Sequence, residues 1–459
     1  MTSSAISVII LLLSLAAFAA GRQRSLATVG GRRSDLHSLP RHYGYFAASL
    51  VILPSTLILV LWLTFGDFVL ERMTMNSIPE GAVATEGVED HLVLNRVRIA
   101  VDQGDRVEKD PTILAAAKFY REAHGEAVWV TFAAALLAGL AGLAFALKAT
   151  SPEFRARNKV ETIMRVVLIA CSTLAVLTTV GIVASLLFES LRFFQQVPIS
   201  EFLFGLKWSP QTALRADQVG SSGAFGAVPL FAGTLLISLL AMAVAGPIGL
   251  LAAIYLTQYA SGRVRAVAKP ALEILAGVPT VVYGFFAALT IAPLFRDMGL
   301  SVGLDIASES ALAAGVVMGI MIIPFVSSLS DDAITAVPRS LSDGSLALGA
   351  TPSETIRKVI LPAALPGIVG AFLLAVSRAV GETMIVVMAA GMQPNLTANP
   401  FEAVTTVTVQ IVALLTGDQE FDSAKTLSAF ALGLVLFVVT LFFNMIAIRV
   451  VRKYREIYD

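Results

Sequence analysis

The sequence predicts an all-α polytopic membrane protein with a six-helix C-terminal core, three further transmembrane helices before it and a small α+β insert. Of the 459 residues, 56% are hydrophobic and 14% are charged, and the mean hydropathy is +0.79. Soluble domains carry about a quarter charged residues. The charges also lie in blocks between long apolar stretches, which is typical of a chain that crosses a bilayer several times. These observations exclude a soluble globular domain.

Nine stretches have the length of about 20 mostly apolar residues that a transmembrane helix needs. They are residues 4–20, 44–66, 126–147, 165–189, 228–257, 272–296, 309–329, 365–392 and 426–450. A further apolar stretch, 405–415, is too short to span a bilayer, so we expect a re-entrant or periplasmic hairpin there. The last six spans form the predicted core.

The distribution of Lys and Arg predicts the orientation of the chain. One alternating set of connecting segments, which includes the C-terminal tail, holds 20 of these residues, and the opposite set holds 12. Because short basic loops stay in the cytoplasm, we expect a multi-pass protein of the bacterial inner membrane with a cytoplasmic C-terminus. The first span has no basic flank before it and is followed by four arginines between residues 22 and 33, so we expect it to be retained rather than removed as a signal peptide.

We place the domain boundary near residue 160, between an N-terminal extension (1–160) and the core (161–459). The extension holds about three spans and a predicted periplasmic insert at 67–125. Within the insert, apolar and polar residues alternate from Leu92 to Val101, which is the period of a half-buried strand. Asp110-Pro111 then predicts the start of a helix, because Asp caps a first turn and Pro suits its first position. The insert is therefore predicted to be an α+β module.

The loop between the seventh and eighth spans, residues 340–362, has the features of a docking site for another protein. Two short amphipathic helices are predicted around Gly349, where a left-handed backbone favours glycine. Thr351-Pro-Ser-Glu354 predicts a capping box that starts the second helix, and Leu361-Pro362 is expected to end it. The residues that we expect to serve docking are Asp343, Leu346, Leu348, Gly349, Ile356, Leu361 and Pro362, with Leu346, Leu348 and Ile356 as exposed apolar knobs.

This loop resembles the coupling loop of ABC importer permeases, whose pattern is Glu-Ala-Ala, three residues, Gly, nine residues, an aliphatic residue, one residue and Leu-Pro. Gly349, Val359 and Leu361-Pro362 stand at those spacings, whereas Asp343-Gly344-Ser345 replaces the leading triplet. The resemblance implies a six-helix permease core that docks on a separate ATP-binding subunit. The sequence contains no Gly-x4-Gly-Lys-Ser/Thr phosphate loop, so we expect that partner to bind and hydrolyse ATP and this chain to hold no cofactor.

The eighth predicted span carries two ionisable residues, Arg378 and Glu382. Four residues apart, they would share one face of a helix, and an ionisable residue at membrane depth usually faces a pathway or a partner. We expect the Arg378 guanidinium to hold a phosphate oxyanion through two hydrogen bonds, and Glu382 to orient or neutralise it. A structural ion pair that locks two helices together is the alternative.

The segment from Arg378 to Thr383 resembles, more narrowly, the PstC-type permeases of phosphate-specific ABC importers. Further likenesses to that family begin at Phe225-Gly226, at Asn399-Pro400 and at Gly417-Asp418. The resemblance covers about residues 160–459 and implies import of inorganic phosphate from the periplasm to the cytoplasm by alternating access.

The same resemblance implies the partners of the chain. These would be a PstA-type permease, two PstB-type ATP-binding subunits and a periplasmic PstS-type phosphate-binding protein. We expect the PstS-type protein to dock on the loops at 190–227 and 393–424.

Other classes of transporter and enzyme share only part of these features. A PstA-type subunit, or a permease for molybdate or sulfate, would share the coupling loop. A secondary transporter should show two similar halves with paired broken helices, and the sequence has no such repeat. A membrane-embedded enzyme would need clustered polar groups in its spans, and the four histidines lie in the first third without metal-ligand spacing. We therefore expect a transport subunit in contact with lipid, with no catalytic residues, metal site or nucleic-acid partner.

Overall fold

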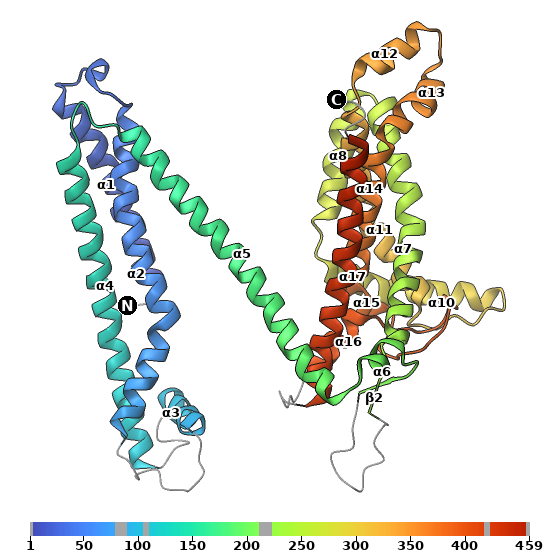
Figure 1. Ribbon diagram of the computed structural model, residues 1–459, viewed down its shortest axis with the longest axis horizontal. Helices are drawn as coiled ribbons and strands as arrows, with labels where there is room; N and C mark the ends of the chain where they lie inside the picture. The colour runs from blue at the N-terminus through green and yellow to red at the C-terminus, as the bar shows by residue number, and fades with distance from the viewer. Residues whose placement is uncertain (1–2, 79–89, 104–109, 211–222, 417–422, 456–459) are drawn as a thin grey trace. The chain divides into compact units, whose positions relative to one another are not determined.

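The computed structural model describes residues 3–78, 90–103, 110–210, 223–416 and 423–455 (Figure 1). Within these ranges, nine helices are long and apolar enough to cross a membrane, which confirms the predicted spans. The chain forms two compact units, Met1–Leu177 and Thr178–Asp459. The division falls inside helix α5 (Ala156–Gln196), later than the boundary near residue 160 that the sequence suggested.

The first unit is a helical bundle. It contains α1 (Ser3–Thr28), η1 (Arg33–Asp35), α2 (Pro40–Ser77), α3 (Asp90–Gln103), α4 (Pro111–Ala149) and the beginning of α5. α1, α2 and α4 lie side by side, and α3 lies at one end of them (Figure 1).

Small residues let α2 and α4 approach closely in this bundle. The Ser55 hydroxyl of α2 donates a hydrogen bond of 2.7 Å to the carbonyl of Ala135 in α4. Gly139 and Gly142 follow Ala135 along α4. A Cβ at Gly139 would lie 2.8 Å from the Ser55 oxygen, and a Cβ at Gly142 would overlap the Leu50 carbonyl. Small side chains and interhelical hydrogen bonds associate helices in a bilayer, where apolar contact alone gives little preference for one neighbour.

The insert predicted at 67–125 corresponds to shorter connections in the structure. α2 continues to Ser77, and α4 begins at Pro111, where Asp110 caps it by accepting the Thr112 N–H at 2.9 Å. The cap was predicted correctly, but the helix that it starts runs on as a complete membrane span.

The segment from Leu92 to Val101, predicted as a strand, lies in helix α3 instead. Its apolar residues fit the period of a strand as well as that of a helix. Val93, Val97 and Ala100 recur at helical spacing and are buried against α4. The prediction of a strand at this position is therefore wrong, because packing on a neighbouring helix decided between two periods that the sequence left balanced. Residues 79–89 and 104–109 of the predicted insert lie outside the described residues.

The second unit begins with the rest of α5, α6 (Ile199–Phe204) and an antiparallel pair of strands, β1 (Trp208–Ser209) and β2 (Ala224–Phe225). Its central part is α7 (Val228–Ile254), η3 (Tyr255–Tyr259), α8 (Gly262–Ala276), α9 (Thr280–Phe286), η4 (Ala287–Ile291), α10 (Ala292–Ser301) and α11 (Ala311–Thr335). It ends with α12 (Arg339–Ala347), α13 (Pro352–Thr355), η5 (Ile356–Ile360), α14 (Leu361–Val380), α15 (Met384–Ala389), α16 (Val407–Leu415) and α17 (Ala424–Arg455).

Helix α11 forms the centre of this unit and packs along α7. A Cβ at Gly315 would lie 2.6 Å from the Cβ of Leu240, and one at Gly319 would lie 2.8 Å from the Cβ of Val244. Both glycines therefore let the two helix backbones approach, and α14 and α15 close the core on other sides. α12 and α13 project from one end of the unit, and α6 and α16 lie at the other end (Figure 1).

Two predicted spans are broken by short non-helical segments. The sequence predicts one span at 272–296, whereas α8 ends at Ala276 and the span begins at Thr280, after Gly277-Val278-Pro279. It also predicts one span at 365–392, whereas α14 ends at Val380 and α15 begins at Met384. Mean hydropathy detects the length of an apolar stretch, and it does not detect a Gly or Pro break within that stretch.

The short apolar stretch at 405–415 forms the nine-residue helix α16. At about 1.5 Å per residue, it is less than half as long as a bilayer core of roughly 30 Å. The prediction that it does not span is therefore confirmed. Its Gln410 side chain accepts the indole N–H of Trp208 at 3.0 Å and donates to the Met392 carbonyl at 2.9 Å, so α16 is tied to the strand pair.

Candidate functional site

Arg378 lies in the last turn of α14, beside the break that precedes α15. Its guanidinium carbon is 5.6 Å from the centroid of the Phe325 ring, and its Nη2 is 3.8 Å from the sulfur of Met321. Met321 and Phe325 are in the middle of α11, a helix of 25 residues. Arg378 is therefore at mid-span depth, with its side chain exposed on the surface of this single chain.

The structure does not place Glu382 on the same helix face as Arg378. Gly381 is the C-cap of α14, so Glu382 lies in the non-helical break. Its carboxylate accepts the N–H of Met384 at 3.2 Å at the start of α15. Among the described residues, Arg378 forms no ion pair with Glu382, and the predicted pairing at helical spacing is corrected because the helix ends before the second residue is reached.

Threonine hydroxyls bond the break between α14 and α15 to α16, and bond the start of α16 to α7. The Thr408 hydroxyl donates a hydrogen bond of 2.8 Å to the backbone carbonyl of Glu382. The Thr234 hydroxyl of α7 accepts the N–H of Val407 at 3.1 Å. Gly233 makes this approach possible, because a Cβ there would overlap the carbonyl oxygen of Thr405. Carbonyl and N–H groups that the helix break and the start of α16 leave open thus gain hydrogen bonds.

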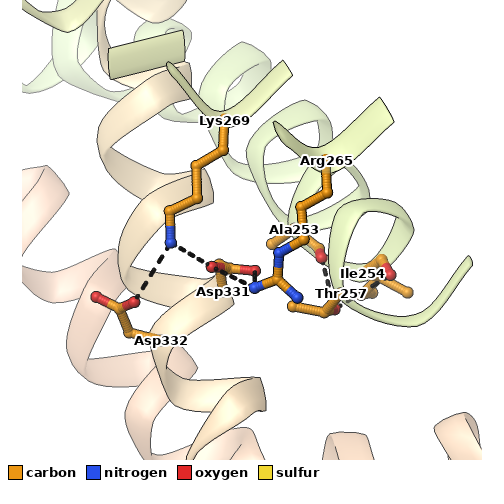
Figure 2. Close-up of polar contacts among 7 residues, drawn as sticks. All are labelled: Ala253, Ile254, Thr257, Arg265, Lys269, Asp331 and Asp332. Atoms are coloured by element: carbon orange, nitrogen blue, oxygen red, sulfur yellow. Dashed lines mark hydrogen bonds and ion pairs between the residues drawn. The ribbon is translucent and has the colours of Figure 1, made fainter. Parts of the chain in front are cut away.

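A second charged site links α8 to α11. The buried Asp331 carboxylate accepts hydrogen bonds from Arg265 at 3.0 and 3.1 Å and from Lys269 at 2.7 Å (Figure 2). Lys269 is also 3.9 Å from Asp332, which is mostly exposed. The hydrogen bond to Asp331 is the main cause that raises the pKa of the Lys269 ammonium above its ordinary value. One carboxylate that is 6% exposed is thereby balanced by two cations.

This cluster was not predicted from the sequence, although a signal for it exists. Arg265 and Lys269 are four residues apart on an amphipathic helix, so they share a face. Asp331 is near the end of α11, the second long span after α8, and lies at the same predicted membrane boundary as α8. A search for opposite charges at matching depths would have paired them.

A cavity of about 220 Å³ lies between α8 and α11 beside this cluster. Its lining includes Lys269, Ser327, Ser328 and Phe325. Because the Phe325 ring also lies under Arg378, the cavity extends from the charged cluster to the aromatic support of the intramembrane arginine.

The loop at 340–362 has the two-helix form that the sequence predicted. Gly349 has a φ of +88° between α12 and α13, a conformation that L side chains rarely adopt. The Thr351 hydroxyl accepts the N–H of Glu354 at 3.3 Å, and the Glu354 carboxylate accepts the N–H of Thr351 at 3.0 Å, which confirms the capping box. The hydroxyls of Ser345 and Thr355 are 2.9 Å apart and join the two helices across the turn.

The end of this loop differs from the expectation. Leu361-Pro362 does not end a helix, because the chain runs from the π turn η5 directly into α14. Proline lacks an N–H and clashes with the carbonyl four residues earlier, and the wider π turn just before it accommodates both effects.

The predicted docking residues are divided between surface and core. Leu348 is 92% exposed and Leu346 is 44% exposed, so both are free to contact a partner. Asp343, Gly349 and Pro362 are exposed as well, and Leu361 is half-buried. Ile356, in contrast, is 8% exposed and packs on Ile334, Ile360 and other residues of the unit. The prediction of Ile356 as an exposed knob is wrong, because its face of η5 covers α11 and α14.

Comparisons with known proteins agree with this arrangement. A model of the "Binding-protein-dependent transport system inner membrane component" family matches residues 245–456, which include Arg378 and the docking loop. A model described as "Phosphate ATP-binding cassette transporter" matches residues 7–178, and so ends one residue after the first compact unit.

The similarity to curated relatives covers most of the length of each relative. The chain is 33% identical to the probable ABC transporter permease protein YqgH of Bacillus subtilis over 287 residues, 61% of this chain and 88% of that protein. It is also 33% identical to phosphate transport system permease protein PstC 1 of Mycobacterium tuberculosis, over 55% of this chain and 81% of the relative. The chain belongs to the PstC-type ABC permease family. A probable PstC protein of Methanocaldococcus jannaschii is 29% identical, over 58% and 87%.

Membership in this family identifies the chain as an ABC transporter permease subunit with a multi-pass membrane core. The family assignment agrees with the resemblance drawn from the coupling loop and from the segment at Arg378. The loops at 190–227 and 393–424, where we expect the PstS-type protein to dock, include residues 211–222 and 417–422, which lie outside the described residues.

Proposed function

We propose that this permease moves inorganic phosphate from the periplasm into the cytoplasm as part of an ATP-driven importer. The observation that carries the proposal is Arg378, a cation at mid-span depth beside a helix break, with no described carboxylate paired to it. A charge at this depth usually faces a pathway. The Phe325 ring supports the guanidinium of Arg378, and the N–H groups of this guanidinium can bind two oxygens of one phosphate.

ATP hydrolysis would be supplied by a separate pair of PstB-type subunits. The sequence has no phosphate loop of its own, and Leu346 and Leu348 are exposed at the tip of α12. A PstA-type permease would complete the pathway on the exposed side of Arg378, and a PstS-type protein would deliver phosphate at the end where α6 and α16 lie. The Lys and Arg distribution supports a cytoplasmic position for α12 and the C-terminus.

Alternating access requires that motion of the docking loop reach the intramembrane site. α12 and α13 are joined by the Ser345–Thr355 contact, and η5 continues without interruption into α14, which carries Arg378. A displacement of the loop would therefore be transmitted along one continuous helical segment to the arginine. The second link, from α8 through Asp331 to α11, would reach Phe325 on the other side of the same site.

Uptake of ³²P-phosphate tests the proposal directly. A bacterium without its own phosphate importers would express this chain together with PstA-, PstB- and PstS-type proteins, and the omission of each protein would be measured in parallel. We expect uptake only when this chain is present, with no competition from excess sulfate or molybdate. Uptake of labelled sulfate or molybdate in place of phosphate would refute the substrate assignment and leave the permease assignment intact.

A further inference from the structure

A basic pocket of about 440 Å³ lies at the end of α1 and α2 in the first unit. Its volume falls within the range of about 300–1,000 Å³ that is usual for small-molecule sites. Arg22, Arg33 and Arg41 line it together with Phe18, Leu26 and Leu39. We call it the α1–α2 pocket. The transport pathway proposed above lies entirely in the second unit and makes no use of it.

The local chain geometry brings the three arginines together from separate elements. Phe18, Arg22 and Leu26 are spaced by four residues and form one stripe on α1. After α1 ends, Gly30 and Gly31 have φ values of +57° and +86°, and the chain reverses there toward η1, which carries Arg33. Arg41 then projects from the first turn of α2.

The charge in the α1–α2 pocket is unbalanced. No carboxylate is among its lining residues. Among the described residues, none of the three guanidiniums takes part in an ion pair. The nearest acid along the chain, Asp35, instead accepts a hydrogen bond of 3.0 Å from the Ser34 hydroxyl. Three always-charged groups around one cavity repel one another, so an anion that bridges them would be favourable.

The other half of the pocket is apolar and opens onto an apolar helix surface. Phe18 and Leu26 of α1 face Leu39, which is 55% exposed at the start of α2. Along α1, Leu11, Leu12 and Leu15 are more than half exposed and continue toward the centre of the span. A ligand that satisfies both halves is anionic at one end and a hydrocarbon chain at the other.

We propose that the α1–α2 pocket binds the phosphate headgroup of an anionic phospholipid, with the acyl chains along the exposed face of α1. The four arginines between residues 22 and 33 and the neighbouring basic segments predict that this end of the unit meets the cytoplasmic leaflet. Basic pockets between transmembrane helices on that side are suited to acidic headgroups. Inorganic phosphate offers the same oxyanion chemistry but none of the hydrocarbon that the apolar half would cover.

The test uses the full-length chain purified in detergent and stripped of lipid. Native mass spectrometry would measure how much cardiolipin, phosphatidylglycerol or phosphatidylcholine rebinds, and a parallel arm would add orthophosphate as competitor. The test variant combines Arg22→Gln, Arg33→Gln and Arg41→Gln. The matched control, Arg24→Gln, Arg32→Gln and Lys159→Gln, removes the same charge from exposed positions outside the pocket.

We expect the anionic lipids to bind the wild-type chain and the control at least about tenfold more tightly than phosphatidylcholine, and we expect this preference to disappear in the test variant. Millimolar orthophosphate should not displace the lipid. Equal binding by the test and control variants would overturn the proposal, as would binding of orthophosphate in place of lipid. Because the substituted side chains are exposed and the three pocket arginines repel one another, neither variant should unfold at a lower temperature than wild type without added lipid, and lipid-induced stabilisation should be lost only in the test variant.

Discussion

The guanidinium of Arg378 lies over the ring of Phe325, at 5.6 Å from its centroid. An aromatic ring attracts a cation through its quadrupole without neutralising its charge. Arg378 Nη2 is also directed to the Met321 sulfur at 3.8 Å, and the other N–H groups along the guanidinium edge remain available for an oxyanion. A carboxylate partner would have occupied the same edge and cancelled the charge, and this difference makes Arg378 suited to bind a transient anion.

Arg378→Gln should reduce phosphate uptake by about 100-fold or more, because a hydrogen bond to a charged group contributes about 1.5–3 kcal/mol and two are lost. Uptake of ³²P-phosphate measures the effect, and co-purification with the partner subunits should be unchanged. Arg296→Gln is the matched control, since Arg296 is exposed and bonds only to the Ser308 hydroxyl among its described contacts. Wild-type uptake by Arg378→Gln would remove Arg378 from the pathway.

Asp331→Asn should weaken the attachment of α8 to α11 by about 1–3 kcal/mol, because two cations lose a charged hydrogen-bond partner while remaining about a third exposed. Asp332→Asn is its control, because that neighbour is 68% exposed and 3.9 Å from Lys269. Thermal unfolding of the purified chain would compare the two. An equal effect of both substitutions would contradict a specific role for Asp331.

The same cluster predicts a pH dependence. The pKa of Lys269 is raised by its hydrogen bond to Asp331. A raised pKa in the folded state gives a stabilisation that is complete below the unfolded pKa, about 10.4, and is lost as pH rises through the higher folded value. The difference in the free energy of unfolding between wild type and Lys269→Met should therefore be constant between about pH 6 and 9 and should fall only above pH 10. A loss of that difference near neutral pH would contradict the assignment.

Local signals in the sequence predicted local structure well. The nine spans follow from apolar length, and the Thr351–Glu354 box and the Gly349 turn follow from side-chain chemistry within a few residues. Each is determined by neighbours along the chain, so no knowledge of the fold was needed.

Tertiary contacts decided the features that the sequence did not predict. Glu382 leaves the face of Arg378 because Gly381 ends α14, and the carbonyl that this exposes is bonded by Thr408, 26 residues further on. Ile356 is buried because α11 and α14 cover it. Arg265 and Lys269 meet Asp331 across more than 60 residues. A pattern within one segment carries no information about a partner so far away.

Leu348 is exposed and Ile356 is buried in the docking loop, residues 340–362. Substitution of the first should therefore affect ATPase binding, and substitution of the second should affect stability. Leu348→Asp should leave stability within about 0.5 kcal/mol, because the residue is 92% exposed, and should abolish co-purification with the ATPase. Ile356→Ala should lower stability by about 2–5 kcal/mol, because it opens a cavity in the core. Leu206→Asp, at a position 67% exposed at the other end of the unit, should affect neither ATPase binding nor stability.

Gly349 should tolerate only residues that accept a left-handed backbone. Its φ of +88° strains a β-branched residue by about 1–3 kcal/mol, so Gly349→Val should shift the turn and separate Ser345 from Thr355. Gly349→Asn should be better tolerated, because Asn adopts positive φ more readily. Gly181→Val, within α5 and with open space around it, controls for side-chain bulk outside the docking loop. ATPase co-purification and phosphate uptake should both fall for Gly349→Val, remain for Gly349→Asn and persist for Gly181→Val. Equal activity of the two Gly349 variants would show that the turn conformation does not control coupling.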